Sequence, residues 1–271
     1  MTIHPTAVIE PGAQLGENVT VGAYSVIDRD VQLGDGCAIG SHVSILGHTI
    51  LGAGCRVHAG AVIGDLPQDL AYTGGVSYVR IGNNTVIREG VTIHRGTKPD
   101  SVTTIGDGCL LMVNSHVGHN ATVGNQVIIT NGALLAGYVQ VGDRTVISGN
   151  CLIHQHTRIG RLAMLCGSTA TQRDVPPFCM TRSFTNTVIS LNVVGLRRAG
   201  FTPAQRLEVK RAFDTLYRSG LSVAEAVSKL EQNPESELTL EFCNFIKSSK
   251  RICKFYFQTR KATDEDDADE V

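Results

Sequence analysis

Aliphatic residues recur at every sixth position along the first two thirds of the chain. The recurrence covers residues 3–63, resumes over 81–93 and resumes again over 105–165. The positions concerned are Ile3, Ile9, Leu15, Val21, Ile27, Leu33, Ile39, Ile45, Leu51, Val57, Ile63, Ile81, Ile87, Ile93, Ile105, Leu111, Val117, Val123, Ile129, Leu135, Val141, Ile147, Ile153, Ile159 and Leu165. A period of six cannot hold one face of an α-helix, so the pattern predicts a stack of short strands.

Two other positions of each repeat are restricted as well. The residue after the aliphatic is often glycine, as at Gly16, Gly34, Gly106 and Gly142, which marks a corner that needs unusual dihedrals or a close backbone approach. The residue four positions after the aliphatic is small. Each repeat therefore places one large and one small side chain inward, and three repeats form a triangular coil of about 18 residues. Coils that stack as parallel strands about 4.8 Å apart form a prism roughly 40 Å long.

Two insertions interrupt the repeat, at residues 66–80 and 98–104. In a β-helix such insertions must leave as loops from a corner, and loops on a rigid scaffold are where binding residues concentrate. After Leu165 the repeat fades, and the segment that follows, with Pro176 and Pro177, is expected to be an irregular cap.

Helix signatures follow the cap. Thr202, with Pro203 at the first helical position, begins a helix expected to run to about Ser219 and to stop at Gly220. Ser222 and Glu225 form a capping box for a second helix, and residues 237–254 are expected to form a third.

The predicted fold is therefore mainly β, with a parallel β-helix followed by a small α-helical domain. We expect the β-helix, its two loop insertions and its cap to span residues 1–190, and the α-helical C-terminal domain to span 191–257. The end of the chain, 258–271, is acidic and poor in apolar residues, so we expect disorder there.

Composition narrows the functional classes. The net charge is −1 and 42% of the residues are apolar, a balance that argues against charge-driven binding of nucleic acid. No apolar run approaches the length of a membrane span, and the N-terminus lacks a secretory pattern, so we expect no integral membrane segment and a cytoplasmic location.

Four of the eight cysteines, namely Cys37, Cys55, Cys109 and Cys151, occupy the small inward position of the repeat. Cys37 and Cys55 are expected to stack in adjacent coils. The chain has no C-x-x-C pair, which favours reduced thiols that act as small hydrophobic side chains over disulfides or metal ligands.

Histidines cluster in three segments, at His94, at His116 and His119, and at His154 and His156. A lone surface histidine is usually only solvated, but clustering favours chemistry, and His119 is a candidate general base because histidine titrates near neutral pH. A zinc site is disfavoured, because two side chains three residues apart on a β-coil diverge; we expect no metal and no cofactor.

The motifs PQDL, IHRG, SHVGH, HQ and GLRRAGF, together with the hexads, resemble the acyl-[acyl-carrier-protein]:UDP-N-acetylglucosamine O-acyltransferase family. The resemblance covers the chain up to about Phe255. It implies a left-handed β-helix, a homotrimer with active sites between subunits, and transfer of a 3-hydroxyacyl group from acyl carrier protein to the 3-hydroxyl of UDP-N-acetylglucosamine, the first step of lipid A biosynthesis.

The resemblance also implies roles for individual residues. His119 would be the catalytic base, Asn120 would orient it, and the backbone N–H of Gly137 would stabilise the oxyanion. Gly167 matches the position where the family measures acyl-chain length. Including that position, the implied substrate-binding residues are Gln68, Asp69, His94, His116, Tyr138, His154, Gln155, Gly167, Asn192 and Arg198.

Several residues depart from the family pattern. Asn120 stands where the family usually has Asp, and an amide can orient an imidazole but cannot offset the imidazolium charge. The other departures are Tyr138 for His, Ala71 for Lys, Val194 for Glu, Ala199 for Arg, and Phe184 and Thr185 where a His-containing segment is usual.

These departures leave alternatives open. One is a paralogous acyltransferase with another nucleotide amino sugar as acceptor or an acyl-CoA donor. A second is a binding or regulatory protein without activity on the same scaffold, and a third is a zinc hydratase.

A basic helical surface, comprising Arg211, Arg218, Lys247, Lys250, Arg251 and Lys254, could meet an acidic carrier protein, or it could be a solvated helix face.

Overall fold

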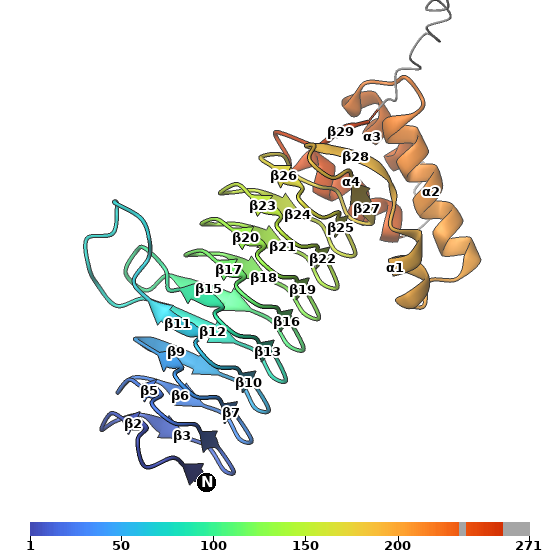
Figure 1. The fold of residues 1–271 in the computed structure, drawn as a ribbon. Helices are drawn as coiled ribbons and strands as arrows, with labels where there is room; N and C mark the ends of the chain where they lie inside the picture. Colours follow the sequence, from blue (N-terminus) through green and yellow to red (C-terminus); the bar gives the residue numbers. More distant parts are fainter. Residues whose placement is uncertain (233–236, 257–271) are drawn as a thin grey trace, which may run out of the picture.

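The chain winds into a left-handed parallel β-helix with a group of α-helices at its C-terminal end (Figure 1). The computed structural model describes residues 1–232 and 237–256. The predicted fold class is confirmed. The expected disordered tail, 258–271, lies outside the described residues, and the division of the chain at residue 190 stays a prediction.

Three sheets form the faces of the prism, and successive strands of the chain visit them in turn. The first sheet comprises β1 (Thr2–Ile3), β4 (Thr20–Val21), β7 (Ala38–Ile39), β10 (Arg56–Val57), β13 (Val86–Ile87), β16 (Leu110–Leu111), β19 (Ile128–Ile129), β22 (Val146–Ile147), β25 (Met164–Leu165), β27 (Cys179–Thr181), β28 (Thr187–Leu191) and β29 (Lys254–Phe255). The second comprises β2 (Val8–Ile9), β5 (Val26–Ile27), β8 (Ser44–Ile45), β11 (Val62–Asp65), β14 (Thr92–His94), β17 (His116–Val117), β20 (Leu134–Leu135), β23 (Leu152–Ile153) and β26 (Ala170–Thr171). The third comprises β3 (Gln14–Leu15), β6 (Gln32–Leu33), β9 (His48–Leu51), β12 (Tyr78–Ile81), β15 (Val102–Ile105), β18 (Thr122–Val123), β21 (Gln140–Val141) and β24 (Arg158–Ile159).

The interior follows the six-residue pattern. The repeated aliphatics are buried from Val21 onward, and the small residues between them, such as Val19 and Ala61, are buried too. Cys37, Cys55, Cys109 and Cys151 are buried free thiols, as predicted. The Cys37 thiol donates to the carbonyl of Gly52 at 3.1 Å, so this inward position also links neighbouring coils.

The corner between the third and first sheets explains the recurrent glycine. A Cβ on Gly106 would lie 2.7 Å from the backbone of Gly124 in the next coil, closer than real Cβ contacts allow. One position further along, the side-chain oxygens of Asp107 and Asn125 each accept the backbone N–H one coil below, from Asn83 at 2.6 Å and from Asp107 at 2.9 Å. Glycine and the following Asp or Asn therefore lock successive coils together at this corner.

Both insertions leave from one corner, between the second and third sheets. The first loop joins β11 to β12 and the second joins β14 to β15; the first projects from the side of the prism in Figure 1. The loops are shorter than predicted, because residues 78–80 and 102–104 already belong to strands. Tyr78–Ile81 pairs with His48–Leu51 on one side and with Val102–Ile105 on the other, so stacking resumes before the aliphatic position returns.

The C-terminal helices are α1 (Val193–Arg198), α2 (Pro203–Tyr217), α3 (Val223–Gln232) and α4 (Glu237–Lys247). The predicted caps are present: Gln205 N–H donates to Thr202 Oγ1 at 3.2 Å, and Glu225 N–H donates to Ser222 Oγ at 3.3 Å. The cap expected to be irregular instead contains the antiparallel hairpin β27–β28 and the helix α1. The hairpin was missed because its alternating buried residues do not follow the hexad.

The third predicted helix ends at Lys247 rather than at residue 254, because Asp174 draws the following segment into the sheet. Asp174 is buried, and its carboxylate accepts from Ser249 Oγ at 2.6 Å and from Arg158 N–H at 2.9 Å. Its backbone N–H donates to Arg251 O at 2.9 Å, and its carbonyl accepts from Cys253 N–H at 2.9 Å. The segment beyond α4 therefore ends in β29, paired with β28.

The inward ladder should dominate stability. Leu135 is fully buried, whereas its neighbour Leu134 points outward and is 41% exposed. We expect Leu135→Ala to lower the free energy of unfolding by about 2–5 kcal/mol and Leu134→Ala to lower it by less than about 1 kcal/mol. Urea denaturation of both variants measures the difference, and equal losses would contradict the assigned inward and outward directions.

Candidate functional site

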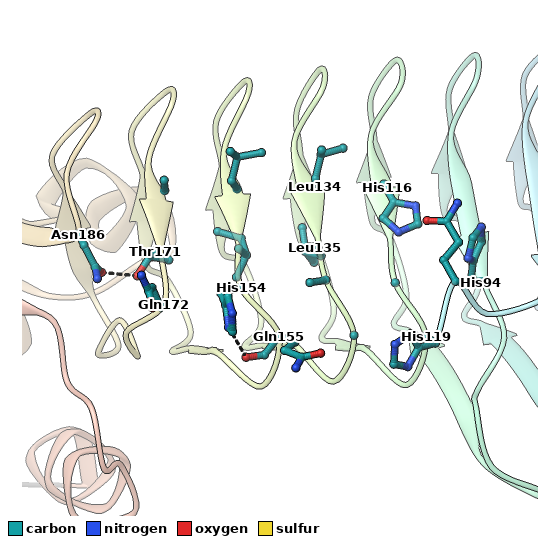
Figure 2. A pocket seen from close by; sticks show the side chains of 17 residues that line it. His94, His116, His119, Leu134, Leu135, His154, Gln155, Thr171, Gln172 and Asn186 are labelled. Atoms are coloured by element: carbon teal, nitrogen blue, oxygen red, sulfur yellow. Dashed lines mark hydrogen bonds between the residues drawn. The ribbon is translucent and has the colours of Figure 1, made fainter. Parts of the chain in front are cut away.

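An elongated cavity of about 580 Å³ lies along the second sheet, next to the corner from which both loops leave. Five successive coils and the segment before β28 contribute to it, and Figure 2 shows their side chains in sequence along the prism. The lining residues are Gln68, His94, His116, Gly118, His119, Leu134, Leu135, Ala136, Gly137, Leu152, Ile153, His154, Gln155, Ala170, Thr171, Gln172 and Asn186. Seven of the residues predicted from the sequence are in this set: Gln68, His94, His116, His119, Gly137, His154 and Gln155.

His119 lies at the turn after β17 and is only 7% exposed. Its ring lies against Gly137 of the next coil, where any Cβ would overlap the imidazole. Within residues 1–232 and 237–256 the N–H of Gly137 donates no hydrogen bond, whereas the N–H of Tyr138 donates to His119 O at 2.9 Å. The site thus combines an imidazole with an unused backbone donor.

Two polar groups flank the two nitrogens of His119. Nδ1 lies 3.1 Å from Asn120 Oδ1, and Nε2 lies 3.6 Å from Asp69 Oδ2. Asp69 comes from the first loop, so the insertion predicted to carry binding residues does reach His119. The edge of the His119 ring meets the ring of Tyr138 at a centroid distance of 5.3 Å.

His94 and His116 form a neutral pair beside His119. Burial, reinforced by the neighbouring His94 and His119, lowers the pKa of His116 to about 4. Burial also lowers the pKa of His94. The two rings meet edge to face at 5.0 Å, and His116 Nδ1 shares a hydrogen bond of 2.7 Å with Thr92 Oγ1. At neutral pH both rings are uncharged, so each can donate one hydrogen bond and accept another.

Apolar side chains form a strip along the same cavity. Leu134, Leu152 and Ala170 stack on three successive coils at the outward position of the second sheet, and Leu152 is 51% exposed. Sequence reasoning missed these residues, together with Gln172 and Asn186. An apolar residue directly before the repeated aliphatic is the pattern that could have revealed the leucines.

The remaining predicted residues do not line the cavity. Asp69, Asn120 and Tyr138 stand around His119. Gly167 lies in the turn after β25, where an added Cβ would meet only the carbonyl of Gly149 at 3.6 Å.

Asn192 and Arg198 belong to α1 and its cap, away from the cavity of the same chain. Asn192 is buried: its Oδ1 accepts from Gly195 N–H at 2.9 Å, and its Nδ2 donates to Leu162 O at 2.9 Å. Arg198 is exposed in the last turn of the helix. Their roles toward substrate stay predictions.

Residues 1–232 and 237–256 contain no cluster of three or more His, Cys, Asp or Glu side chains placed to hold a metal ion. Over the same residues no helix has the length and apolar character needed to span a membrane.

Comparisons with known proteins give a consistent picture. A family model described as UDP N-acetylglucosamine O-acyltransferase, domain 2, matches residues 174–253, and a model of bacterial transferase hexapeptide repeats matches residues 30–65 and 103–137. The curated acyl-[acyl-carrier-protein]–UDP-N-acetylglucosamine O-acyltransferase of Anaeromyxobacter sp. (strain Fw109-5) is 42% identical over 93% of this chain and 98% of its own length. The protein of the same name from Campylobacter concisus (strain 13826) is 39% identical over 92% of this chain and 95% of its own length.

Solved structures agree. The UDP-N-acetylglucosamine acyltransferase from Campylobacter jejuni is 40% identical and matches with a TM-score of 0.90, covering 94% of this chain and 100% of that one. The corresponding Arabidopsis enzyme is 35% identical, with a TM-score of 0.81, covering 93% of this chain and 100% of that one. The resemblance seen in the motifs is confirmed, and the chain belongs to the acyl-[acyl-carrier-protein]–UDP-N-acetylglucosamine O-acyltransferase family.

Proposed function

We propose that this protein transfers a 3-hydroxyacyl group from acyl carrier protein to the 3-hydroxyl of UDP-N-acetylglucosamine, the first step of lipid A biosynthesis. Family membership supports the substrates, which are those named for its relatives. The observation that carries the chemistry is the placement of the buried His119 ring against Gly137, whose N–H has no partner among the described residues.

In the proposed reaction Nε2 of His119 takes the proton from the sugar 3-hydroxyl as that oxygen attacks the thioester carbon. The N–H of Gly137 donates to the oxyanion that forms, a contribution worth about 3–4 kcal/mol in comparable acyl transfers. The C–S bond then breaks, and the imidazolium of His119 returns the proton to the departing thiolate. Atoms and charge balance without a cofactor.

The part of the cavity around His119 would hold the sugar nucleotide. Gln68, Asp69, His94 and His116 surround His119 there, and His154 with Gln155 lies further along the prism. Asp69, next to Nε2, would also offset the imidazolium charge, while Asn120 orients the ring from the other side.

The apolar strip of Leu134, Leu152 and Ala170 would hold the acyl chain. Open space at Gly167 would leave room for a long one.

We infer a homotrimer in which a neighbouring subunit completes the site. Asn192 and Arg198 are away from the cavity of their own chain, so a neighbour's α1 would bring Arg198 to the nucleotide. A soluble carrier protein and a nucleotide sugar as substrates are consistent with a cytoplasmic enzyme. The basic helical surface is the proposed contact for the acidic carrier protein.

Removing the base should abolish most of the activity. We expect His119→Ala to lower kcat at least about 10²-fold, the usual range for a general base being 10²–10⁴. The assay uses 3-hydroxyacyl carrier proteins with a panel of UDP-amino sugars and, separately, acyl-CoA donors. His42→Ala, at a distant corner, is the control. Normal turnover of the His119 variant would refute the assignment, and preference for another acceptor or for acyl-CoA would favour a paralogous activity.

Gly137 should tolerate no side chain. The Cβ of Gly137→Ala would displace the His119 ring, and a misplacement of about 1 Å can cost 10²-fold in rate. We expect kcat to fall by about that factor while the melting temperature and circular dichroism are little changed. Undiminished turnover would show that the ring does not react from its observed position.

Gly167 should control the length of the donor chain. Its φ is outside the left-handed region, so Gly167→Leu can fold without backbone strain. We expect this variant to lose more than about tenfold in kcat/KM with long donors. In the blocked pocket several methylene groups of the acyl chain would stay exposed to water, and burial of each is worth about 0.8 kcal/mol. Short donors in the same assay are the internal control, and an unchanged length preference would remove Gly167 from the acyl path.

A further inference from the structure

The donor and acceptor of each hydrogen bond behind His119 follow from one group that can only donate, the backbone N–H of Thr97. The backbone N–H of Thr97 lies 3.0 Å from the terminal amide of Asn120. A backbone N–H can only donate, so the atom that faces it must be the amide oxygen, Oδ1. This contact identifies the direction in which the Asn120 amide is turned.

The same oxygen determines the tautomer of His119. Nδ1 of the ring lies 3.1 Å from Asn120 Oδ1, and an oxygen that only accepts requires a proton on that nitrogen. In the neutral ring Nε2 then carries the lone pair. Nε2 is the nitrogen on the side of Asp69, where the proposed base must act.

Two hydroxyls extend the chain. Thr97 Oγ1 lies 3.0 Å from Asn120 Oδ1 and must donate to it. With its only proton used there, Thr97 Oγ1 must accept from the hydroxyl of Tyr138, which lies 2.9 Å away. Tyr138 therefore donates to Thr97, and Thr97 donates to Asn120 Oδ1. The same oxygen accepts the proton on Nδ1 of His119.

Each member of the chain is held from a different part of the fold. Thr97 belongs to the loop between β14 and β15, and Asn120 donates its backbone N–H to Thr103 Oγ1 at 2.8 Å. The ring of Tyr138 stacks on His156 of the following coil at 4.8 Å, with an interplanar angle of 15°. The second loop and three stacked coils thus hold the members of this hydrogen-bond chain.

We propose that Thr97 and Tyr138 are positioning residues that, through Asn120, hold His119 in the tautomer with its lone pair on Nε2. The step from tautomer to rate rests on the proposed function; the tautomer itself does not. These hydrogen-bonded groups orient His119 as the third member of a catalytic triad orients its histidine. Unlike a triad carboxylate, they are neutral and add no charge.

A direct test is nitrogen NMR of the full-length protein labelled with ¹⁵N-histidine, without substrate. The His119 signals are assigned by their loss in His119→Ala. We expect a protonated Nδ1 and an unprotonated Nε2 in the wild type. In Thr97→Val the hydroxyl donor is lost and the backbone N–H of residue 97 holds the amide oxygen without it, so we expect a measurable minor fraction of the opposite tautomer. An unprotonated Nδ1 in the wild type, or an unchanged tautomer in Thr97→Val, would overturn the proposal. A protein without transfer activity but with the expected tautomer would refute only the proposed function.

Kinetics provide the second readout. A hydrogen bond of this kind is worth about 1 kcal/mol, so we expect Thr97→Val and Tyr138→Phe each to lower kcat about fivefold with KM little changed. Because both act through one oxygen, the double variant should lose no more than Thr97→Val alone. Tyr24→Phe, an exposed tyrosine stacked on His42, is the matched control. Additive losses, or losses in KM alone, would contradict a shared positioning role.

Asn120→Asp separates orientation from charge. A carboxylate accepts all three hydrogen bonds, so the tautomer should be retained. Its negative charge should stabilise the protonated ring, so we expect the acid limb of the kcat/KM profile to move to higher pH. The other titratable groups around the ring, Asp69, His94, His116, Tyr138 and His156, are unchanged in this comparison. An unshifted acid limb would show that Asn120 does not contact the reacting ring.

Discussion

Stacking of equivalent residues one coil apart is the constraint on which the whole structure depends. Each strand has only a few residues and would not be stable alone. Every strand is therefore held by backbone hydrogen bonds to the neighbouring coils and by the inward side chains stacked above and below its own. The same constraint builds the site. His116, Leu134 and Leu152 line one cavity because they occupy the same register position on successive coils, and His119 meets Gly137 for the same reason.

The repeat explains how much of the fold was predictable. Its period, the inward cysteines and the caps at Thr202 and Ser222 are local patterns, and the structure contains all of them. The hairpin β27–β28, helix α1 and strand β29 follow no hexad, and they depend on contacts such as those of Asp174 that join distant segments. Tertiary contacts rather than local propensity decided these elements.

The site was predictable to a similar degree. Family motifs pointed to His119, Gly137 and most of the polar lining, but the residues hydrogen-bonded behind the His119 ring come from distant parts of the sequence. Thr97 and Asn120 are separated by 23 positions, and Thr97 and Tyr138 by 41, with an insertion between repeats that hides their common corner. Sequence spacing alone cannot reveal that these residues are in contact. In the structure Asn120, which departs from the family pattern, accepts hydrogen bonds from both Thr97 and His119.

The segment beyond α4 links the helices to the cavity. Arg251, whose carbonyl accepts from Asp174, also donates from its guanidinium to the carbonyl of Gln155 at 3.1 Å, and Gln155 lines the cavity. The segment between α4 and β29 is thus hydrogen-bonded to a wall of the cavity. This segment therefore braces the cavity wall: a chain cut just after α4 would keep the sequence of its helices but lose the hydrogen bond that ties Arg251 to Gln155.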